Sequence, residues 1–254
     1  MKILVTGANG FLGKHLVEYL SPNHEVSTIS RTNCNLTDEN SVDKYFLGKA
    51  FDLLLHCAVV GGYREDDDNF DVFSQNLKIN LNLLKHKNKF SKIIHFNSGA
   101  SSLPSFYGQS KRINSEIVNL IGGYNWKIFN CFGSHESENR FIKGSIIKYL
   151  KKEPIIIHQN RFMDFFYVED VGRLIEQNVN QDLDLVYKRK YNLFEIANII
   201  NNLDTHKVDI IIENNYFAPD YVGKNSIKLD YIGAVEGIQK MYKTLKNEYY
   251  QWIK

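Results

Sequence analysis

The sequence has few cysteines, no long apolar run and almost no net charge, and each of these absences excludes a class of protein. Cys34, Cys57 and Cys131 are widely spaced in 254 residues, without a CxxC or Cys/His pattern. This argues against a disulfide framework and a structural zinc site and favours a reducing, cytoplasmic compartment. No segment reaches the roughly 18 apolar residues of a membrane helix, and the N-terminus lacks the apolar core of a secretory signal. The net charge of +2 offers no basic surface for nucleic acid or an anionic membrane.

Short apolar runs alternate with amphipathic helical patterns through the first half of the chain. The predicted strands cover residues 2–6, 24–30, 51–58 and 92–98, and the predicted helices cover residues 11–20 and 75–87. This alternation is typical of an α/β fold with a doubly wound parallel sheet, whose strands are buried on both faces. Over residues 71–86, Phe73, Leu77, Leu81 and Leu84 recur at helical spacing, so we expect them to form a buried face.

The pattern loosens after residue 133. A polar loop precedes an amphipathic helix at 142–152, and beyond it short apolar strands mix with helices. We therefore predict a dinucleotide-binding Rossmann domain over residues 1–133 and a smaller α/β substrate lobe over residues 134–254, with part of 155–180 returning to the first domain.

The segment TGANGFLG, residues 6–13, places three glycines between the first predicted strand and the first helix. Gly7 permits a tight turn, Gly10 lets the backbone approach a pyrophosphate, and Gly13 lets helix and strand pack closely. The N–H groups at the start of the helix favour an anion. A glycine trio alone also occurs in structural turns, but its place in a βαβ unit favours dinucleotide binding. The cofactor contacts predicted from this turn are Gly7, Asn9, Gly10, Phe11, Leu12 and Gly13.

The residues after the second predicted strand bear on the choice of dinucleotide. An acid there binds the ribose of NAD, whereas a basic residue binds the extra phosphate of NADP. Arg31 occupies this place, and the first acid that follows is Asp38. Because a guanidinium is well suited to phosphate, we expect NADP(H) bound by Arg31, with Asp38 in a loop under the adenine. A solvated surface arginine is the alternative.

Together with the glycine turn, four further segments resemble the extended short-chain dehydrogenases/reductases, a family of nucleotide-sugar epimerases, dehydratases and reductases. They are FDLLLHCA (51–58), NSGASS (97–102), YGQSK (107–111) and DFFYVEDVGRLIE (164–176). Within the family the chain is most similar to GDP-L-fucose synthases, and YGQSK is also similar to that of dTDP-4-dehydrorhamnose reductases. The likeness to fucose synthases rests on Val60-Gly61-Gly62, Arg31-Thr32 and the group Asn130, Phe132, Gly133 and His135.

The resemblance implies a catalytic set of Ser98, Tyr107 and Lys111. A tyrosine hydroxyl has a pKa of about 10, and a cation four residues away on the same helix face lowers it. Ser98 can hydrogen-bond a carbonyl oxygen that gains charge as hydride arrives, while Tyr107 gives it a proton. By itself the Tyr107/Lys111 spacing favours an ordinary surface helix.

The resemblance also implies further contacts and a quaternary structure. Ala58 and Asn130 are expected at the cofactor, and Gly61, Arg140 and Arg161 at the substrate. A homodimer is expected through the helix over residues 72–86 and the helix that starts at Tyr107.

Three departures from the family pattern bear on the reaction. Ser98 and Tyr107 are nine positions apart, closer than is usual, and Ser101 or Ser102 can replace Ser98 if the loop is threaded differently. Ala100 stands where fucose synthases have a cysteine, and their histidine falls near Arg140, so we predict that epimerisation is lost. Met163 stands where the family has an arginine, and either Arg161 replaces that diphosphate contact or the contact is missing.

Other polar residues are interpreted as structural. His56 and His95 lie in buried strand patterns, His135 shapes a loop, and the acidic run 65–68 is a solvated loop rather than a metal site. The predicted function is NADPH-dependent reduction of a 4-keto nucleotide sugar, GDP-linked and without epimerisation, for a deoxy-sugar or heptose of a surface polysaccharide. The alternatives are an NAD-dependent UDP-sugar 4-epimerase and a non-catalytic dinucleotide sensor.

Overall fold

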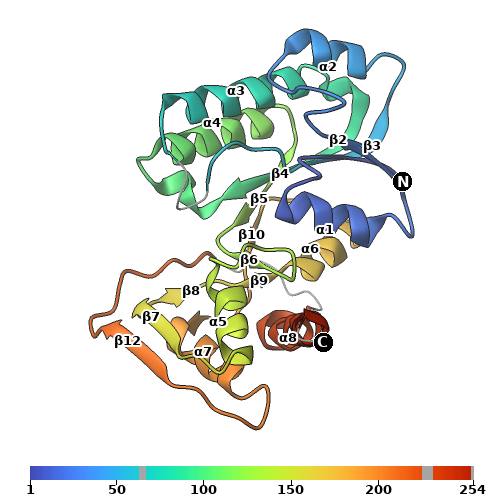
Figure 1. Cartoon of the computed structure of the whole chain (residues 1–254). Coiled ribbons are helices and arrows are strands. Elements are labelled where there is room, and N and C mark those ends of the chain that lie inside the picture. The colour runs from blue at the N-terminus through green and yellow to red at the C-terminus, as the bar shows by residue number, and fades with distance from the viewer. Residues whose placement is uncertain (63–66, 225–230, 253–254) are drawn as a thin grey trace. The chain divides into compact units, whose positions relative to one another are not determined.

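The computed structural model describes residues 1–62, 67–224 and 231–252, which divide into two compact units (Figure 1). Unit 1 comprises Met1–Ile128 and Ile175–Asp184, and unit 2 comprises Phe129–Leu174 and Leu185–Lys254. Among the helices in the described part of the chain, none is both long and apolar enough to cross a bilayer.

Unit 1 is organised around a six-stranded sheet with the order β10-β5-β4-β3-β1-β2. Its strands are β1 (Lys2–Thr6), β2 (Glu25–Ile29), β3 (Phe51–His56), β4 (Phe90–Ser98), β5 (Tyr124–Ile128) and β10 (Leu183–Leu185). Strands β1 to β5 pair in parallel. The order of strand addition reverses between β1 and β3, the switch point at which open parallel sheets bind ligands. The predicted doubly wound α/β fold is confirmed.

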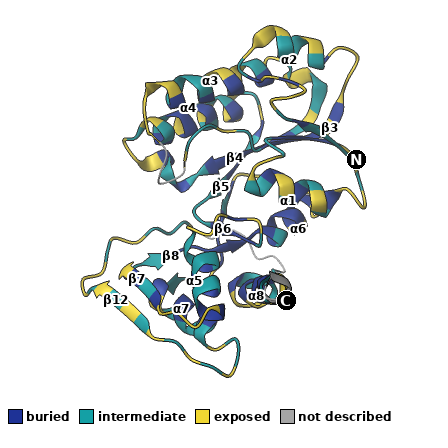
Figure 2. Ribbon diagram, viewed as in Figure 1, coloured by how far each residue is buried: buried dark blue, intermediate teal, exposed yellow. Residues whose placement is uncertain are grey.

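Helices and two short 3₁₀ turns connect the strands of unit 1. They are α1 (Phe11–Leu20), α2 (Glu39–Tyr45), α3 (Phe70–Leu84), η1 (Lys87–Lys89), η2 (Gly99–Ser102) and α4 (Phe106–Leu120). Most residues of the central strands are buried, dark blue in Figure 2, because a parallel sheet is covered on both faces. Leu4, Leu54 and Ile93 from the sheet pack with Leu83 of α3 and Val118 of α4 in one core cluster.

The buried face of α3 differs from the predicted one. Of the four residues expected there, only Leu84 is buried, and the side chain of Leu81 is 52% exposed. Two asparagines, Asn76 and Asn80, are buried instead, in company with Val72, Ile79 and Leu83. The prediction was wrong because apolar periodicity assigns asparagine to the solvent side, whereas Asn76 is buried with its hydrogen bonds made inside the protein.

Unit 2 combines three two-stranded sheets with helices. Strand β6 (Cys131–Phe132) pairs in parallel with β9 (Phe166–Tyr167), and β7 (Ile155–Gln159) with β12 (Ile210–Asn214). Strand β8 (Phe162–Met163) is antiparallel to β11 (Tyr191–Asn192). The helices are α5 (Phe141–Leu150), α6 (Val168–Glu176), whose last two residues belong to unit 1, α7 (Leu193–Asn201) and α8 (Gly233–Trp252).

A buried carboxylate fixes the beginning of α8 in unit 2. Asp170 is 0% exposed and accepts hydrogen bonds from the N–H groups of Ile232 (2.8 Å) and Gly233 (3.0 Å) and from the hydroxyl of Tyr187. A helix begins with N–H groups that have no partner within the helix, and an anion is stabilising there. Asp170 therefore joins α6 to the start of α8.

Candidate active site

The glycine turn after β1 is a packed structure in which two positions exclude any side chain. Gly7 has a φ of +66°, and a Cβ there would lie 2.8 Å from the Cα of Ala58. A Cβ on Gly13 would lie 2.2 Å from the carbonyl oxygen of Gly7. At Gly10 the same oxygen is 3.3 Å away, which is tight but tolerable. Packing therefore requires glycine at positions 7 and 13, whereas position 10 is more open and suits a close approach by a ligand.

The remaining residues predicted to bind cofactor in unit 1 lie around the switch point and after β2. Asn9 is exposed and Phe11 and Leu12 are half-buried at the start of α1. Ala58 follows β3, and its N–H donates to Thr6 Oγ1 (3.1 Å). Arg31 is exposed, two residues after the end of β2. The carboxylate of Asp38 accepts from the N–H of Asn40 (3.1 Å) and caps α2, so Asp38 has a structural task there.

The three predicted catalytic residues lie around the C-terminal end of β4. Ser98 ends the strand, and its Oγ accepts from the N–H of Ala100 (3.1 Å), which leaves the hydroxyl proton for another acceptor. Tyr107 lies in the first turn of α4. Lys111, one turn later and 5% exposed, donates from Nζ to the carbonyl oxygen of Phe96 (2.6 Å). A Cβ on Gly108 would lie 2.3 Å from the Ala100 oxygen, so the turn that carries Tyr107 packs directly on the segment after Ser98.

Burial governs protonation around Lys111. It lowers the pKa of the Lys111 ammonium to about 8, although nearby Cys57 acts to raise it. Lys111 therefore still carries its charge at neutral pH, as a group that stabilises a phenolate must.

His56 and His95 are each 1% exposed, with ring centroids 5.1 Å apart. Burial, with the charge of Lys111 as a smaller cause, lowers the pKa of His56 to about 3 and holds that of His95 well below its usual value. Both rings are neutral at pH 7, and the prediction that they are core residues is confirmed.

The segment after β3 contacts the ring of Tyr107. Gly61 and Gly62 have φ values of +75° and +94°, and a Cβ on Gly62 would lie 2.8 Å from Tyr107 Cζ and 3.0 Å from its hydroxyl oxygen. The side chain of Asn76 accepts from the N–H of Val60 (2.8 Å) and donates to its carbonyl oxygen (3.0 Å). By binding Val60, Asn76 fixes the segment that carries Gly61 and Gly62 beside Tyr107. The positive φ values and the close ring contact exclude other residues at these two positions. Sequence patterning missed this role because a single buried asparagine has no periodic signal.

Asp68 is a second residue that sequence reasoning did not connect with the site. Its carboxylate accepts hydrogen bonds from the backbone N–H groups of Phe106 and Tyr107. Within the acidic run 65–68, residues 65 and 66 lie outside the described residues, and Asp67 and Asp68 are exposed, as a solvated loop predicts.

In unit 2, two of the predicted residues contact each other. Asn130 accepts from a guanidinium N–H of Arg140 (3.3 Å) and donates to the carbonyl oxygen of Asp164 (3.1 Å). Arg140 also lies 4.0 Å from the buried Glu136, whose pKa burial raises to about 8. These contacts hold Arg140 at the beginning of α5.

Arg161, the remaining residue predicted to bind substrate in unit 2, lies elsewhere in that unit. It is half-buried, with its guanidinium carbon 5.9 Å from the ring centroid of Tyr221. Met163, at the position where the family has an arginine, is buried at 9% exposure in β8. The side chain at position 163 is therefore part of the interior of unit 2.

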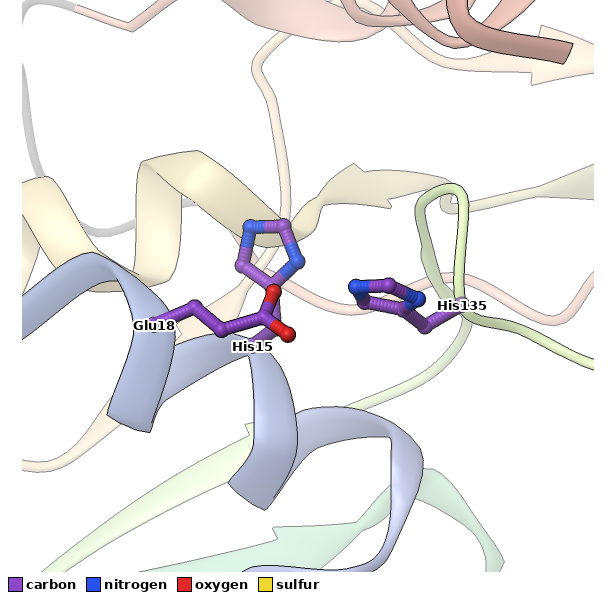
Figure 3. A group of neighbouring side chains, drawn as sticks. All are labelled: His15, Glu18 and His135. Atoms are coloured by element: carbon purple, nitrogen blue, oxygen red, sulfur yellow. The ribbon is translucent and has the colours of Figure 1, made fainter. Parts of the chain in front are cut away.

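Three further titratable side chains are shown in Figure 3. His15 and Glu18 lie one turn apart on α1 in unit 1, and their side chains point to the same side of that helix. His135 follows β6 in unit 2 and is exposed, which agrees with its interpretation as a loop residue.

The chain is similar to known nucleotide-sugar enzymes over most of its length. It is 24% identical over 232 residues to a UDP-2-acetamido-2,6-beta-L-arabino-hexul-4-ose reductase from Pseudomonas aeruginosa, with 82% of this chain and 61% of that protein covered. It therefore spans about three fifths of this relative. It is 23% identical over 288 residues to a GDP-6-deoxy-D-talose 4-dehydrogenase from Aggregatibacter actinomycetemcomitans, with 96% and 97% covered.

Solved structures share the fold. A GDP-L-fucose synthetase from Naegleria fowleri bound to NADP superposes with a TM-score of 0.82 at 14% identity, covering 98% of this chain and 93% of the other. A UDP-N-acetylglucosamine 4-epimerase from Bacillus cereus gives a TM-score of 0.80 at 20% identity, covering 97% and 96%. The model of the NAD dependent epimerase/dehydratase family matches residues 3–193. The chain thus belongs to the NAD dependent epimerase/dehydratase family and is an extended short-chain dehydrogenase/reductase.

Proposed function

We propose that the protein reduces the 4-keto group of a nucleotide sugar with NADPH, acting on a GDP-linked deoxy-sugar or heptose for a surface polysaccharide in the cytoplasm. The observation that carries this proposal is the cationic Lys111 one helical turn from Tyr107, at the end of β4 where Ser98 lies. A redox-silent sensor has no need of this charge beside a phenol.

The glycine turn fits a bound dinucleotide, because Gly10 leaves room for a close approach to the backbone and the N–H groups at the start of α1 favour an anion. The cofactor supplies hydride to the carbonyl carbon. Ser98 donates a hydrogen bond to the carbonyl oxygen, which becomes an alkoxide. Tyr107 protonates that alkoxide, and the charge of Lys111 stabilises the resulting phenolate.

Arg31 supports NADP(H) over NAD. It lies two residues after the end of β2, and residues 32–37 contain no acid to bind the 2′-hydroxyl of NAD. Within unit 1, we assign Arg31 and Ala58 to the cofactor, Gly61 to the substrate, and Ser98, Tyr107 and Lys111 to catalysis. Within unit 2, we assign Asn130 to the cofactor and Arg140 and Arg161 to the substrate, with Arg161 at its diphosphate.

Ala100 supports reduction without epimerisation. Epimerisation next to a ketone needs an acid and a base that exchange protons with the flanking carbons. The side chain of Ala100, two residues after Ser98, is a methyl group that carries no such proton. Incorporation of solvent deuterium at C3 or C5 of the product contradicts this assignment.

The second candidate is a UDP-sugar 4-epimerase, which the family's name includes. Such an enzyme retains NAD and recycles it during turnover, so the purified protein carries bound NAD and converts a sugar nucleotide with no added reductant. Arg31 argues against this reading, because an acid is the usual partner of NAD at that position.

A homodimer through α3 and α4 accounts for an exposed apolar stripe on these helices. Phe70 is 64% exposed, Leu81 52% and Phe106 44%, and the rings of Phe70 and Phe106 lie edge to face (6.3 Å). Large apolar side chains that cluster on a surface are typical of association sites. Light scattering of the wild type and of Leu81→Lys tests this, with a dimer expected for the first and a monomer for the second.

The deciding experiment follows NADPH oxidation against 4-keto GDP-, UDP- and dTDP-hexoses, with product stereochemistry read by NMR. We expect turnover with a GDP-linked ketone. Tyr107→Phe is expected to bind NADPH with nearly unchanged affinity and to lose turnover. Oxidation by this variant at the wild-type rate refutes the role of Tyr107 as proton donor.

A further inference from the structure

Asp68 binds the backbone of Tyr107 from a distant part of the chain. Its Oδ1 accepts from the Tyr107 N–H (2.7 Å) and its Oδ2 from the Phe106 N–H (3.1 Å), across 39 and 38 residues of sequence. Ser105, the local N-cap of α4, accepts from the N–H of Gly108 (3.0 Å). The first turn of α4 thus has two separate caps, of which only Asp68 binds Tyr107 itself.

The carboxylate suits this place on physical grounds. A helix begins with N–H groups that need acceptors, and its dipole favours a negative charge there. Two charge-assisted hydrogen bonds accepted by one carboxylate fix orientation as well as position. A shared carboxylate therefore restrains the backbone from which the phenol projects.

Gly62, which precedes Asp68 in the chain, also limits the ring of Tyr107. Gly62 lies against the ring edge, and Asn76 holds Val60 by both backbone groups. The connection from Ser98 to Tyr107 consists only of residues 99–106. The contacts of Gly62 and Asp68 with Tyr107 therefore add restraints to those of the short segment 99–106.

We propose that Asp68 is a positioning residue for Tyr107, which sets the phenol for proton transfer without touching substrate or cofactor. The inference rests on the proposed function, since it assigns Asp68 to the proton donor of that reaction. Its alternative is that Asp68 only stabilises α4, as any N-cap does.

Four variants separate these roles. Asp68→Ala removes both acceptors, and Asp68→Asn keeps one oxygen. Ser105→Ala removes the neighbouring cap of the same helix end but leaves the Tyr107 N–H bonded. Asp67→Asn is the matched control, because it removes the same charge from the adjacent exposed position.

The test compares the kcat and the KM for NADPH of each variant with the 4-keto sugar nucleotide that the wild type reduces. The thermal stability of each variant is measured alongside. Asp68→Ala is expected to lower kcat by about tenfold or more with the KM for NADPH nearly unchanged, since small misplacements of a catalytic group are costly. Asp68→Asn is expected to recover part of kcat. Ser105→Ala is expected to lose similar thermal stability while it keeps most of kcat, and Asp67→Asn to resemble the wild type. Equal losses of kcat in Asp68→Ala and Ser105→Ala overturn the proposal in favour of a cap alone.

Amide hydrogen exchange provides a readout that needs no substrate. Exchange at Phe106 and Tyr107 is expected to accelerate in Asp68→Ala and to remain unchanged in Asp67→Asn. Unchanged exchange at Tyr107 in Asp68→Ala overturns the contact. If the wild type reduces none of the sugars, the proposed function fails, and with it the catalytic role assigned here, whereas accelerated exchange still shows that Asp68 holds Tyr107.

Discussion

Replacement of Gly13 by alanine is expected to destabilise unit 1, because the new methyl group meets backbone. The Cβ would lie 2.2 Å from the oxygen and 2.8 Å from the carbon of the Gly7 carbonyl. Both distances are shorter than nonbonded contacts allow, by roughly 1 Å. Overpacking of this kind costs about 1–3 kcal/mol. In a chain of this size each kcal/mol shifts the melting temperature by about 2–4 °C, so a fall of about 2–12 °C is expected.

Replacement of Gly10 by alanine separates cofactor binding from stability. The nearest atom to its Cβ is the Gly7 oxygen at 3.3 Å, which a small adjustment can accommodate. The melting temperature is therefore expected to change by less than about 2 °C. The methyl group would nevertheless lie where a pyrophosphate has to approach the backbone, so the Kd for NADPH is expected to rise by about tenfold or more, the effect of losing about 1.4 kcal/mol.

Differential scanning fluorimetry and titration of NADPH fluorescence measure the two effects. Gly10→Ala serves as the control for Gly13→Ala, since both add one methyl group to the same turn. The reasoning is refuted if Gly13→Ala melts with the wild type, or if Gly10→Ala binds NADPH with wild-type affinity.

Three further predictions concern stability and pH. Asp170→Ala leaves the buried donors around the start of α8 without their acceptor and is expected to lower the free energy of unfolding by about 2–5 kcal/mol in urea titrations; an unchanged midpoint contradicts the anchoring role. The kcat of the wild type is expected to fall above about pH 8, where Lys111 loses its proton; a profile flat to pH 10 argues against a role for its charge. Burial raises the pKa of Glu136 from about 4.5 to about 8, so its protonated form favours folding, and this stability is lost as the pH rises from 4.5 through 8. Glu136→Gln is therefore expected to lose less melting temperature than the wild type between pH 5 and 9, and parallel losses contradict it.

The parts of the site that follow one another in sequence were predictable. The glycine turn lies between β1 and α1, Ser98 ends β4, and Tyr107 and Lys111 occupy adjacent turns of α4. Each depends on local order: a strand, a turn and a helix in succession, or two residues at helical spacing. The chemistry of these residue types then indicates a cofactor site and a proton donor.

The contacts that support Tyr107 were not predictable by the same means. Asp68 reaches α4 across 38 residues, and Asn76 reaches Val60 across 16. Neither distance is a helical or strand period, and both residue types are common at exposed positions. Only the folded chain brings these acceptors and donors together.

The burial of Asn76 on α3 is explained by the same site. A buried asparagine costs free energy unless its hydrogen bonds are made, and Asn76 makes them to Val60 and to Ser110 of α4. A leucine at position 76 would bury more apolar surface but would release the glycine pair that contacts Tyr107. Asn76 therefore lies on the inward side of the helix, with the buried Val72, Ile79 and Leu83, where it holds the segment beside the phenol. Leu81 and Phe70 are exposed, and a second copy of the chain is the partner that we propose to cover them.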